Sequence, residues 1–250
     1  ATLGEAGFTG SLYLMGSNGG VLTQTETRRN PLLLVESGPV GGAAGAAELG
    51  LRLGLRHLVA FDMGGTTAKA VLIEDGEAVV SPLYWVGGYD RGYPVQAAVL
   101  DIVEVGAGGG SIAAINELGA LQVGPRSAGA LPGPACYGHG GTEPTVTDAN
   151  LWLGRLDGAR FLSGTMPLRA ELAAQALDGL ARRLDQETAF LAAGILRIAT
   201  LTMASAVRRV TIERGFDPRD FAMVAFGGAG PLHAVDVARE IAMRQVIIPL

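Results

Sequence analysis

The sequence has little of what a disulfide-bonded, membrane-spanning or nucleic-acid-binding protein needs. Its single cysteine, Cys136, excludes an internal disulfide. Neither a signal peptide nor an uninterrupted apolar run of the roughly 18 residues that a membrane span requires is recognisable. Lys69 is the one lysine among 19 basic residues, and the formal net charge of -5 leaves no basic surface for nucleic acid. These absences predict a cytoplasmic protein that binds neither nucleic acid nor membrane.

Glycine, in contrast, is abundant. The chain has 38 glycines in 250 residues, well above the usual share of roughly 7%. They cluster in short runs, which is typical of loops that approach a ligand closely. Hydrophobic residues make up 48% of the chain, so a substantial core can be buried.

Both ends of the chain look like cuts through a longer protein. The chain begins at Ala1 without a methionine and stops directly after an apolar run, residues 246–250. Its mean hydropathy of +0.32 suggests apolar faces that missing sequence or a partner covers. We therefore expect a fragment in which residues 1–35 end a preceding domain and residues 36–250 form one domain.

The centre of the chain predicts antiparallel strands joined by a glycine loop. Apolar runs lie on both sides of residues 62–67, and Asp75 with Gly76 forms a hairpin signal, because both turn residues take positive φ. A third strand is expected directly afterwards, at residues 79–80. A helix of small residues, 40–53, precedes this group and predicts close packing. The order is that of the start of an RNase H-like sheet.

The rest of the chain mixes strands, loops and helices. Residues 124–150 are so rich in proline and glycine that we expect no regular helix there, but an ordered loop or a functional lid. Residues 112–123 form either a hairpin or a short helix, and we favour the hairpin. A βαβ unit with a glycine turn ends the chain. The expected strands are 11–15, 101–105, 221–226 and 246–249, and the expected helices are 169–184, 187–214 and 231–243.

The loop at residues 62–67 has the parts of a phosphate-binding loop. Glycines let backbone amides converge on phosphate oxygens, threonine hydroxyls add donors, and an aspartate at the end of a strand can hold hydrated Mg²⁺. The alternative is a tight turn without a ligand. Lys69 either meets a phosphate or is a solvated strand residue. The candidate residues are Asp62, Gly64, Gly65, Thr66, Thr67 and Lys69.

A second glycine loop, with Gly227, Gly228 and Gly230, follows a predicted strand and opens a helix. Backbone amides and the positive helix end at the carboxyl edge of a sheet suit a nucleotide. His233, in the first helical turn, either faces a ligand or is packed or solvated.

Two carboxylates and one cysteine are further candidates. Glu104 and Asp148 adjoin glycine-rich segments, where a carboxylate can bind Mg²⁺ or position a water; Asp148 is alternatively an N-cap of residues 149–153. Cys136 and His139 are too few soft ligands for a zinc site. A structural role for Cys136 is favoured over a nucleophilic one.

Together, five blocks of sequence resemble the hydantoinase A and 5-oxoprolinase family. They span almost the whole chain in order, and their combination is highly specific, although His139 stands where arginine is commoner in the family. The blocks are 62–69 (DMGGTTAK), 104–111 (EVGAGGGS), 133–138 (GPACYG), 144–150 (PTVTDAN) and 226–233 (FGGAGPLH).

The resemblance implies an α/β fold of the actin-like ATPase (RNase H-like) type, with a mixed sheet, glycine-rich phosphate loops and flanking helices. Residues 62–67 resemble its second phosphate loop and 227–230 its adenosine loop, with ATP and Mg²⁺ (or Mn²⁺) as cofactors. Gly108, Gly109 and Gly110 are nucleotide-binding candidates, Asp62 and Asp148 metal-ligand candidates, and Asp62, Asp148, Glu104 and His233 catalytic candidates. The first phosphate loop is absent, so the chain is expected to hold half of an ATP site and to be inactive alone.

The function implied by the resemblance is that of an ATP-dependent hydrolase subunit. It would open a cyclic amide (5-oxoproline, a hydantoin or N-methylhydantoin) through a phosphorylated intermediate, in a hetero-oligomer with a hydantoinase B-type subunit or domain. The alternative is a subunit of an ATP-dependent ketone carboxylase of the acetone or acetophenone type. A third hypothesis, an Hsp70-like nucleotide-gated module, lacks a β-rich peptide-binding domain.

Overall fold

A computed structural model describes residues 2–86 and 92–249 and centres on one mixed sheet of six strands. The strands lie in the order β8, β4, β3, β11, β12, and β5 pairs with the far end of β4. β11 is parallel to β3 and β12, whereas β4 is antiparallel to β3, β5 and β8. This is the predicted RNase H-like arrangement. The strands are β3 (Leu58–Met63), β4 (Ala68–Glu74), β5 (Glu77–Ala78), β8 (Ile102–Val105), β11 (Ala222–Phe226) and β12 (Gln245–Ile247).

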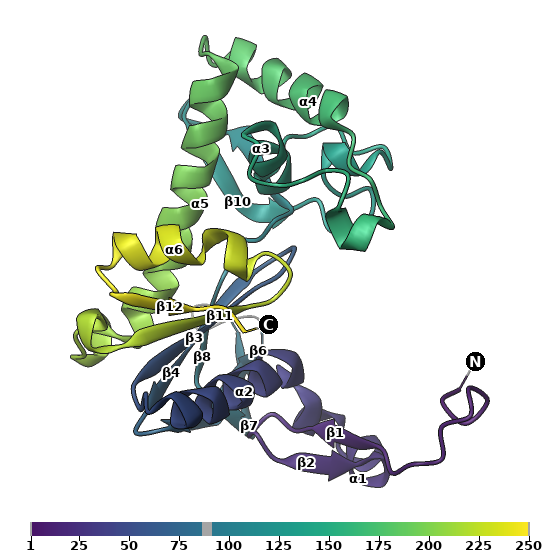
Figure 1. The fold of residues 1–250 in the computed structure, drawn as a ribbon, viewed down its shortest axis with the longest axis vertical. Coiled ribbons are helices and arrows are strands. Elements are labelled where there is room, and N and C mark those ends of the chain that lie inside the picture. The colour runs from purple at the N-terminus through teal and green to yellow at the C-terminus, as the bar shows by residue number, and fades with distance from the viewer. Residues whose placement is uncertain (1, 87–91, 250) are drawn as a thin grey trace.

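Helices cover both faces of this sheet (Figure 1). On one face, α2 (Ser37–Leu53) buries Val40, Ala43 and Ala46 against the strands. The packing is as close as its small residues predict, because a Cβ at Gly42 would lie 2.0 Å from the ring of Phe226. On the other face lie α5 (Thr188–Val210) and α6 (Gly230–Glu240).

The long helix α5 is apolar enough in length and composition to cross a membrane, because a stretch of 18 residues within 188–214 has a mean hydropathy of 1.7. Its buried side chains, however, pack on β4, β8 and α6 in the largest hydrophobic core. It is therefore placed as the core helix of an α/β domain. The helix expected over 187–214 ends earlier, at Val210, and a 3-10 turn, Ile212–Arg214, follows.

One half of α5 packs on the sheet, and a second group of elements packs against its other half (Figure 1). It contains the predicted hairpin, β9 (Ser111–Ile115) with β10 (Leu121–Ser127), and the helices α3 (Val146–Trp152) and α4 (Ala170–Arg183). The prediction of no regular helix in 124–150 is wrong at its end. After the last proline of that segment, the Thr145 and Asp148 side chains form a capping box that starts α3.

Two further hairpins flank α2. One is β1 (Tyr13–Met15) with β2 (Val21–Thr23), followed by α1 (Gln24–Arg29); the other is β6 (Val80–Val86) with β7 (Tyr93–Leu100). The turn at Asp75 and Gly76 is confirmed, with φ of 52° and 84°. The third strand expected after this turn is present but shorter than expected: Glu77–Ala78 pairs with β4, whereas Val80 already belongs to β6. β8 pairs with the rest of β4.

Candidate functional site

Three glycine loops meet at one edge of the sheet. They follow β3, β8 and β11, which run in the same direction, because β3 and β8 are both antiparallel to β4 and β11 is parallel to β3. Backbone bonds join the loops directly. The Gly109 and Gly110 amides donate to the Gly64 and Gly65 carbonyls at 3.1 and 2.6 Å, and the Ala229 amide donates to the Met63 carbonyl at 2.9 Å. The glycine loops predicted separately from the sequence thus form one surface.

Some of these glycines are required by packing. A Cβ at Gly108 would lie 2.6 Å from backbone atoms of Gly65 and Thr66. Gly227 has a φ of 80°, and a Cβ there would lie 2.3 Å from Asp62 Oδ1. These two positions hold the loops against one another, so their glycines need no ligand to explain them.

Other glycines face open space. Within the described chain, no heavy atom lies within 4 Å of a Cβ built on Gly64, Gly65 or Gly228. Gly65 and Gly228 are exposed, and neither has a positive φ that would demand glycine. Packing and backbone conformation therefore do not account for glycine there, whereas the close approach of a ligand to the backbone does.

A row of charged residues crosses the sheet beside these loops. Asp62, Lys69 and Glu104 lie directly opposite one another on β3, β4 and β8, which places their side chains on the face that α2 covers. Lys69 Nζ lies 3.0 Å from Glu104 Oε1 and donates to Thr67 Oγ1 at 2.8 Å. The Lys69 side chain is 15% exposed. Lys69 is therefore not a solvated strand residue, and its contact with a phosphate stays a prediction.

Asp62 stands apart in this row. Its half-buried carboxylate forms no hydrogen bond or ion pair with any residue in the described ranges. Burial raises its pKa above the ordinary range, and the charge of Lys69 offsets this only in part. A desolvated carboxylate without a partner at the meeting point of three loops fits a hydrated cation.

Asp148 is placed differently from its predicted metal or catalytic role. It is fully buried, and its Oδ2 accepts from the Ala135 amide at 3.2 Å and from the Thr145 amide and hydroxyl at 2.9 and 2.8 Å. Oδ1 accepts from the Cys136 amide at 2.8 Å. These bonds fix the proline-rich loop to the start of α3, so the structure favours the capping role. Thr145 is the N-cap itself, and Asp148 is the third helical residue.

Cys136 and His139 give no support to a nucleophile or a metal. Burial, followed by the nearby Asp148 carboxylate, raises the pKa of the Cys136 thiol, so the reactive thiolate is disfavoured. His139 is exposed. In residues 2–86 and 92–249, no group of three or more His, Cys, Asp or Glu side chains could by itself hold a metal ion.

His233 is also placed away from solvent. It is fully buried, and its Nε2 lies 3.1 Å from Asn150 Nδ2. Its pKa is lowered to about 4, mainly by burial and then by the positive charge of Arg155, against a smaller opposite effect of Asp236. The packed alternative fits this geometry better than proton transfer at a ligand.

Sequence reasoning missed Glu36, Tyr84 and Thr147. Glu36 Oε2 lies 3.9 Å from Lys69 Nζ, and Tyr84 donates its hydroxyl proton to Glu36 Oε1 at 3.2 Å. Thr147 binds the Gly109 carbonyl through both its amide and its hydroxyl, each at 2.8 Å. The glutamate directly before the small-residue helix was a usable signal, whereas the other two contacts depend on long-range folding.

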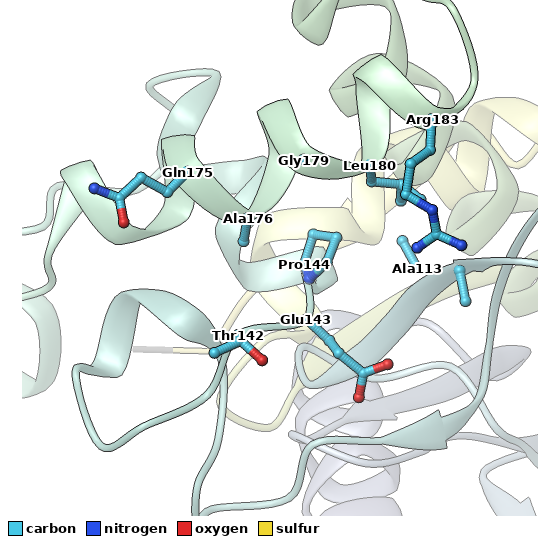
Figure 2. A pocket seen from close by; sticks show the side chains of 10 residues that line it. Ala113, Thr142, Glu143, Pro144, Gln175, Ala176, Gly179, Leu180 and Arg183 are labelled. Atoms are coloured by element: carbon cyan, nitrogen blue, oxygen red, sulfur yellow. The ribbon is translucent and has the colours of Figure 1, made fainter.

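A separate pocket of 280 Å³ lies between α4, β9 and the loop before α3 (Figure 2). Small residues such as Ala113, Ala176 and Gly179 line it, with Glu143 and Arg183 among its charged residues. Its lining includes none of the glycine-loop residues, so it is not part of the site described above.

Known proteins share this chain's sequence and fold. The alpha subunit of caprolactamase from Pseudomonas jessenii is 41% identical over 93% of this chain and 33% of its own length, and its crystal structure aligns with a TM-score of 0.75 over 85% of this chain and 30% of that one. The gamma subunit of acetophenone carboxylase from Aromatoleum aromaticum is 38% identical over 97% of this chain and 33% of its own length. A nucleotide-free acetone carboxylase structure aligns with a TM-score of 0.85 and 27% identity, covering 98% of this chain and 34% of that one.

The chain thus spans about a third of the length of these relatives. Its structural matches are members of the actin-like ATPase fold family, so the predicted fold class is confirmed. The model of the family described as Hydantoinase/oxoprolinase matches residues 1–250, and the chain belongs to that family.

Proposed function

We propose that this chain supplies the second phosphate loop and the adenosine loop of a Mg-ATP site. The observation that carries the proposal is the half-buried carboxylate of Asp62, which has no partner among the described residues and lies at the meeting point of the three glycine loops. The openness of Gly65 and Gly228 supports it, because phosphate oxygens can approach the backbone there.

The residues fit a magnesium nucleotide better than a bare metal ion. Mg²⁺ keeps several waters and is held by one or two carboxylates together with phosphate oxygens, and Asp62 would provide such a carboxylate. Bound there, the ion would neutralise charge on the phosphates during transfer. Lys69, already positioned by Thr67 and Glu104, would add a fixed positive charge. A first phosphate loop must come from outside these residues, so the chain alone would not turn over ATP.

The activity we propose for the whole protein is opening of a cyclic amide. Phosphorylation of the amide oxygen creates a good leaving group and activates the carbonyl carbon toward water. The family description and the 41% identity to a caprolactamase subunit favour this reaction. 5-Oxoproline, hydantoin and N-methylhydantoin are the substrates we propose. Because the relatives named above are subunits, we also propose a hetero-oligomer with a hydantoinase B-type partner.

Ketone carboxylation is the second candidate. The TM-score of 0.85 with acetone carboxylase and the 38% identity to an acetophenone carboxylase subunit favour it specifically. Both candidates use the same step, transfer of a phosphoryl group from ATP to a carbonyl-derived oxygen, and differ in whether water or an activated carboxyl group then reacts. The same site therefore serves either proposal.

The distinguishing experiment measures ADP release by the full-length protein with its B-type partner. The candidate lactams are compared with acetone or acetophenone plus bicarbonate, and products are identified by mass spectrometry. ADP release with ring opening supports the first proposal. Carboxylated product without ring opening contradicts it and supports the second. Robust ATP turnover by residues 1–250 alone would contradict the half-site proposal.

A further inference from the structure

Glu36 adopts an unusual backbone conformation directly before α2. Its φ of 57° and ψ of 20° lie in the left-handed region, which a non-glycine residue enters only against steric resistance. Helix capping does not explain this conformation, because the Glu36 side chain makes no capping bond within the described chain. The side chain is instead directed to the charged row beside the phosphate loop.

The residues around Glu36 orient its carboxylate but leave it able to accept a further hydrogen bond. Tyr84 Oη donates to Oε1 at 3.2 Å, and Lys69 Nζ lies 3.9 Å from Oε2. Burial, followed by the charge of Glu36, raises the pKa of Tyr84 to about 12, so the tyrosine stays a proton donor to the carboxylate. The Glu36 side chain is 18% exposed. Lys69 in turn contacts Thr67 of the phosphate loop.

The other acid-base groups near the loops are already engaged or inaccessible. Asp148 accepts four hydrogen bonds, and His233 is buried with a lowered pKa. Glu104 is 43% exposed and its Oε1 pairs directly with Lys69 at 3.0 Å. Asp62 is the carboxylate that suits the cation. Among these groups, Glu36 is the partly shielded carboxylate with room for another proton donor.

Phosphorylation of an amide oxygen requires such a group. As the oxygen forms its bond to the γ-phosphorus, the bond from that phosphorus to the bridging oxygen breaks and its electrons leave with ADP. The amide N–H bond also breaks, its electron pair forms the C=N bond of the phosphorylated imidate, and the proton must be accepted. With a ketone, the corresponding proton leaves the neighbouring carbon and a C=C bond forms.

We propose that Glu36 is the catalytic residue that accepts this proton, with Lys69 and Tyr84 as positioning residues. The inference rests on the proposed function, and it assigns the base that the sequence left unidentified. It also explains the backbone conformation, because a left-handed residue at the start of α2 aims the carboxylate at the charged row rather than along the helix.

The first test replaces Glu36 by glutamine in the full-length protein with its partner. Glutamine keeps an oxygen for the Tyr84 hydrogen bond but cannot accept the proton. We expect Mg-ATP binding, measured by calorimetry, to be retained, and lactam-dependent or ketone-dependent ADP release to fall about 100-fold or more. Glu48→Gln is the matched control, because Glu48 is an exposed glutamate of α2 whose ion-pair partner among the described residues is Arg52. The activity of Glu48→Gln should equal that of the wild type.

A second variant separates proton transfer from folding. Glu36→Gly relieves the left-handed backbone and leaves space for a small carboxylate. Added formate or acetate should restore its ADP release in a saturable way, and should not restore that of Asp62→Asn. A purely structural role would show no such rescue.

Two results would overturn the inference while leaving the proposed function intact. One is near-wild-type turnover in Glu36→Gln, and the other is loss of Mg-ATP binding in proportion to turnover without rescue of Glu36→Gly. Failure of the wild type to bind Mg-ATP would overturn the proposed function itself, and the inference with it.

Discussion

Asp62 lies directly opposite Lys69 in the pairing of β3 with β4, yet the two side chains form no ion pair. Lys69 is instead held by Glu104 of β8, on the side of β4 away from β3, and by Thr67 of the loop that joins β3 to β4. The carboxylate of Asp62 is therefore left without a hydrogen-bond or ion-pair partner among the described residues. A site that needs a cation for charge balance is the simplest physical account of this arrangement.

The first prediction is that Asp62→Asn does not destabilise the protein. The pKa of Asp62 is raised in the folded state, so its charged form opposes folding, and the cost grows as pH rises from the ordinary carboxyl range through the folded pKa. The thermal midpoint of Asp62→Asn should equal or exceed that of the wild type at pH 7, and the difference should shrink at pH 4. A lower midpoint at pH 7 would mean that Asp62 has a stabilising partner.

The second prediction compares two glycines of the loops. Gly108→Ala should cost about 1–3 kcal/mol of unfolding free energy, because its Cβ would overlap the backbone of Gly65 and Thr66. Gly228→Ala should leave stability unchanged, since its Cβ would meet no described atom within 4 Å, but should weaken ATP binding. Urea unfolding and calorimetry on both variants check this. Equal stability losses would contradict the division into packing and ligand-facing glycines.

A third prediction concerns Asp148. Its two carboxylate oxygens together accept four hydrogen bonds, and asparagine replaces one of these oxygens by an NH2 group that cannot accept. We therefore expect a loss of about 1–3 kcal/mol in the free energy of unfolding, measured in urea. Below the new melting temperature, Mg-ATP affinity should match that of the wild type. A selective loss of Mg²⁺-dependent affinity with unchanged stability would restore the metal-ligand role predicted from sequence.

The fourth prediction is an acid sensitivity caused by His233. Its pKa is lowered from 6.5 to about 4 in the folded protein, so the unfolded chain binds a proton first as pH falls. The neutral His233 side chain contributes its full share of the free energy of unfolding above pH 6.5. This contribution is lost as pH falls from 6.5 to 4, by at most ~3 kcal/mol. His233→Gln should flatten the pH dependence of urea unfolding in this window. An unchanged slope would assign the acid sensitivity elsewhere.

Much of the fold could be predicted because local signals agreed with it. Asp75 with Gly76 set the turn between β4 and β5, and glycine after each of three strands marked the loops. That the three loops converge was not predicted, because it depends on the strand directions in the folded sheet. The third strand was misplaced because the apolar residues Val79 and Val80 suit a strand of the central sheet and the start of β6 equally well. Only long-range strand pairing distinguishes these two positions.

Side-chain partners were harder to predict than loops. Whether Lys69 faced solvent or α2 depended on the face of β4, which alternation alone does not decide. The capping box at Thr145 and Asp148 had a readable spacing, but its proline-rich surroundings masked it. The role of Glu36 needed the three-dimensional meeting of α2, β4 and β6.

The most direct test of the account is calorimetric titration of Mg-ATP into the full-length protein and its Asp62→Asn variant. Asp75→Asn is the control, because Asp75 is an exposed aspartate at the other end of β4, paired with Arg56. The account predicts binding by the wild type and by Asp75→Asn, and strongly weakened binding by Asp62→Asn. Equal binding by all three proteins would contradict the assignment of Asp62 and its glycine loops to the nucleotide.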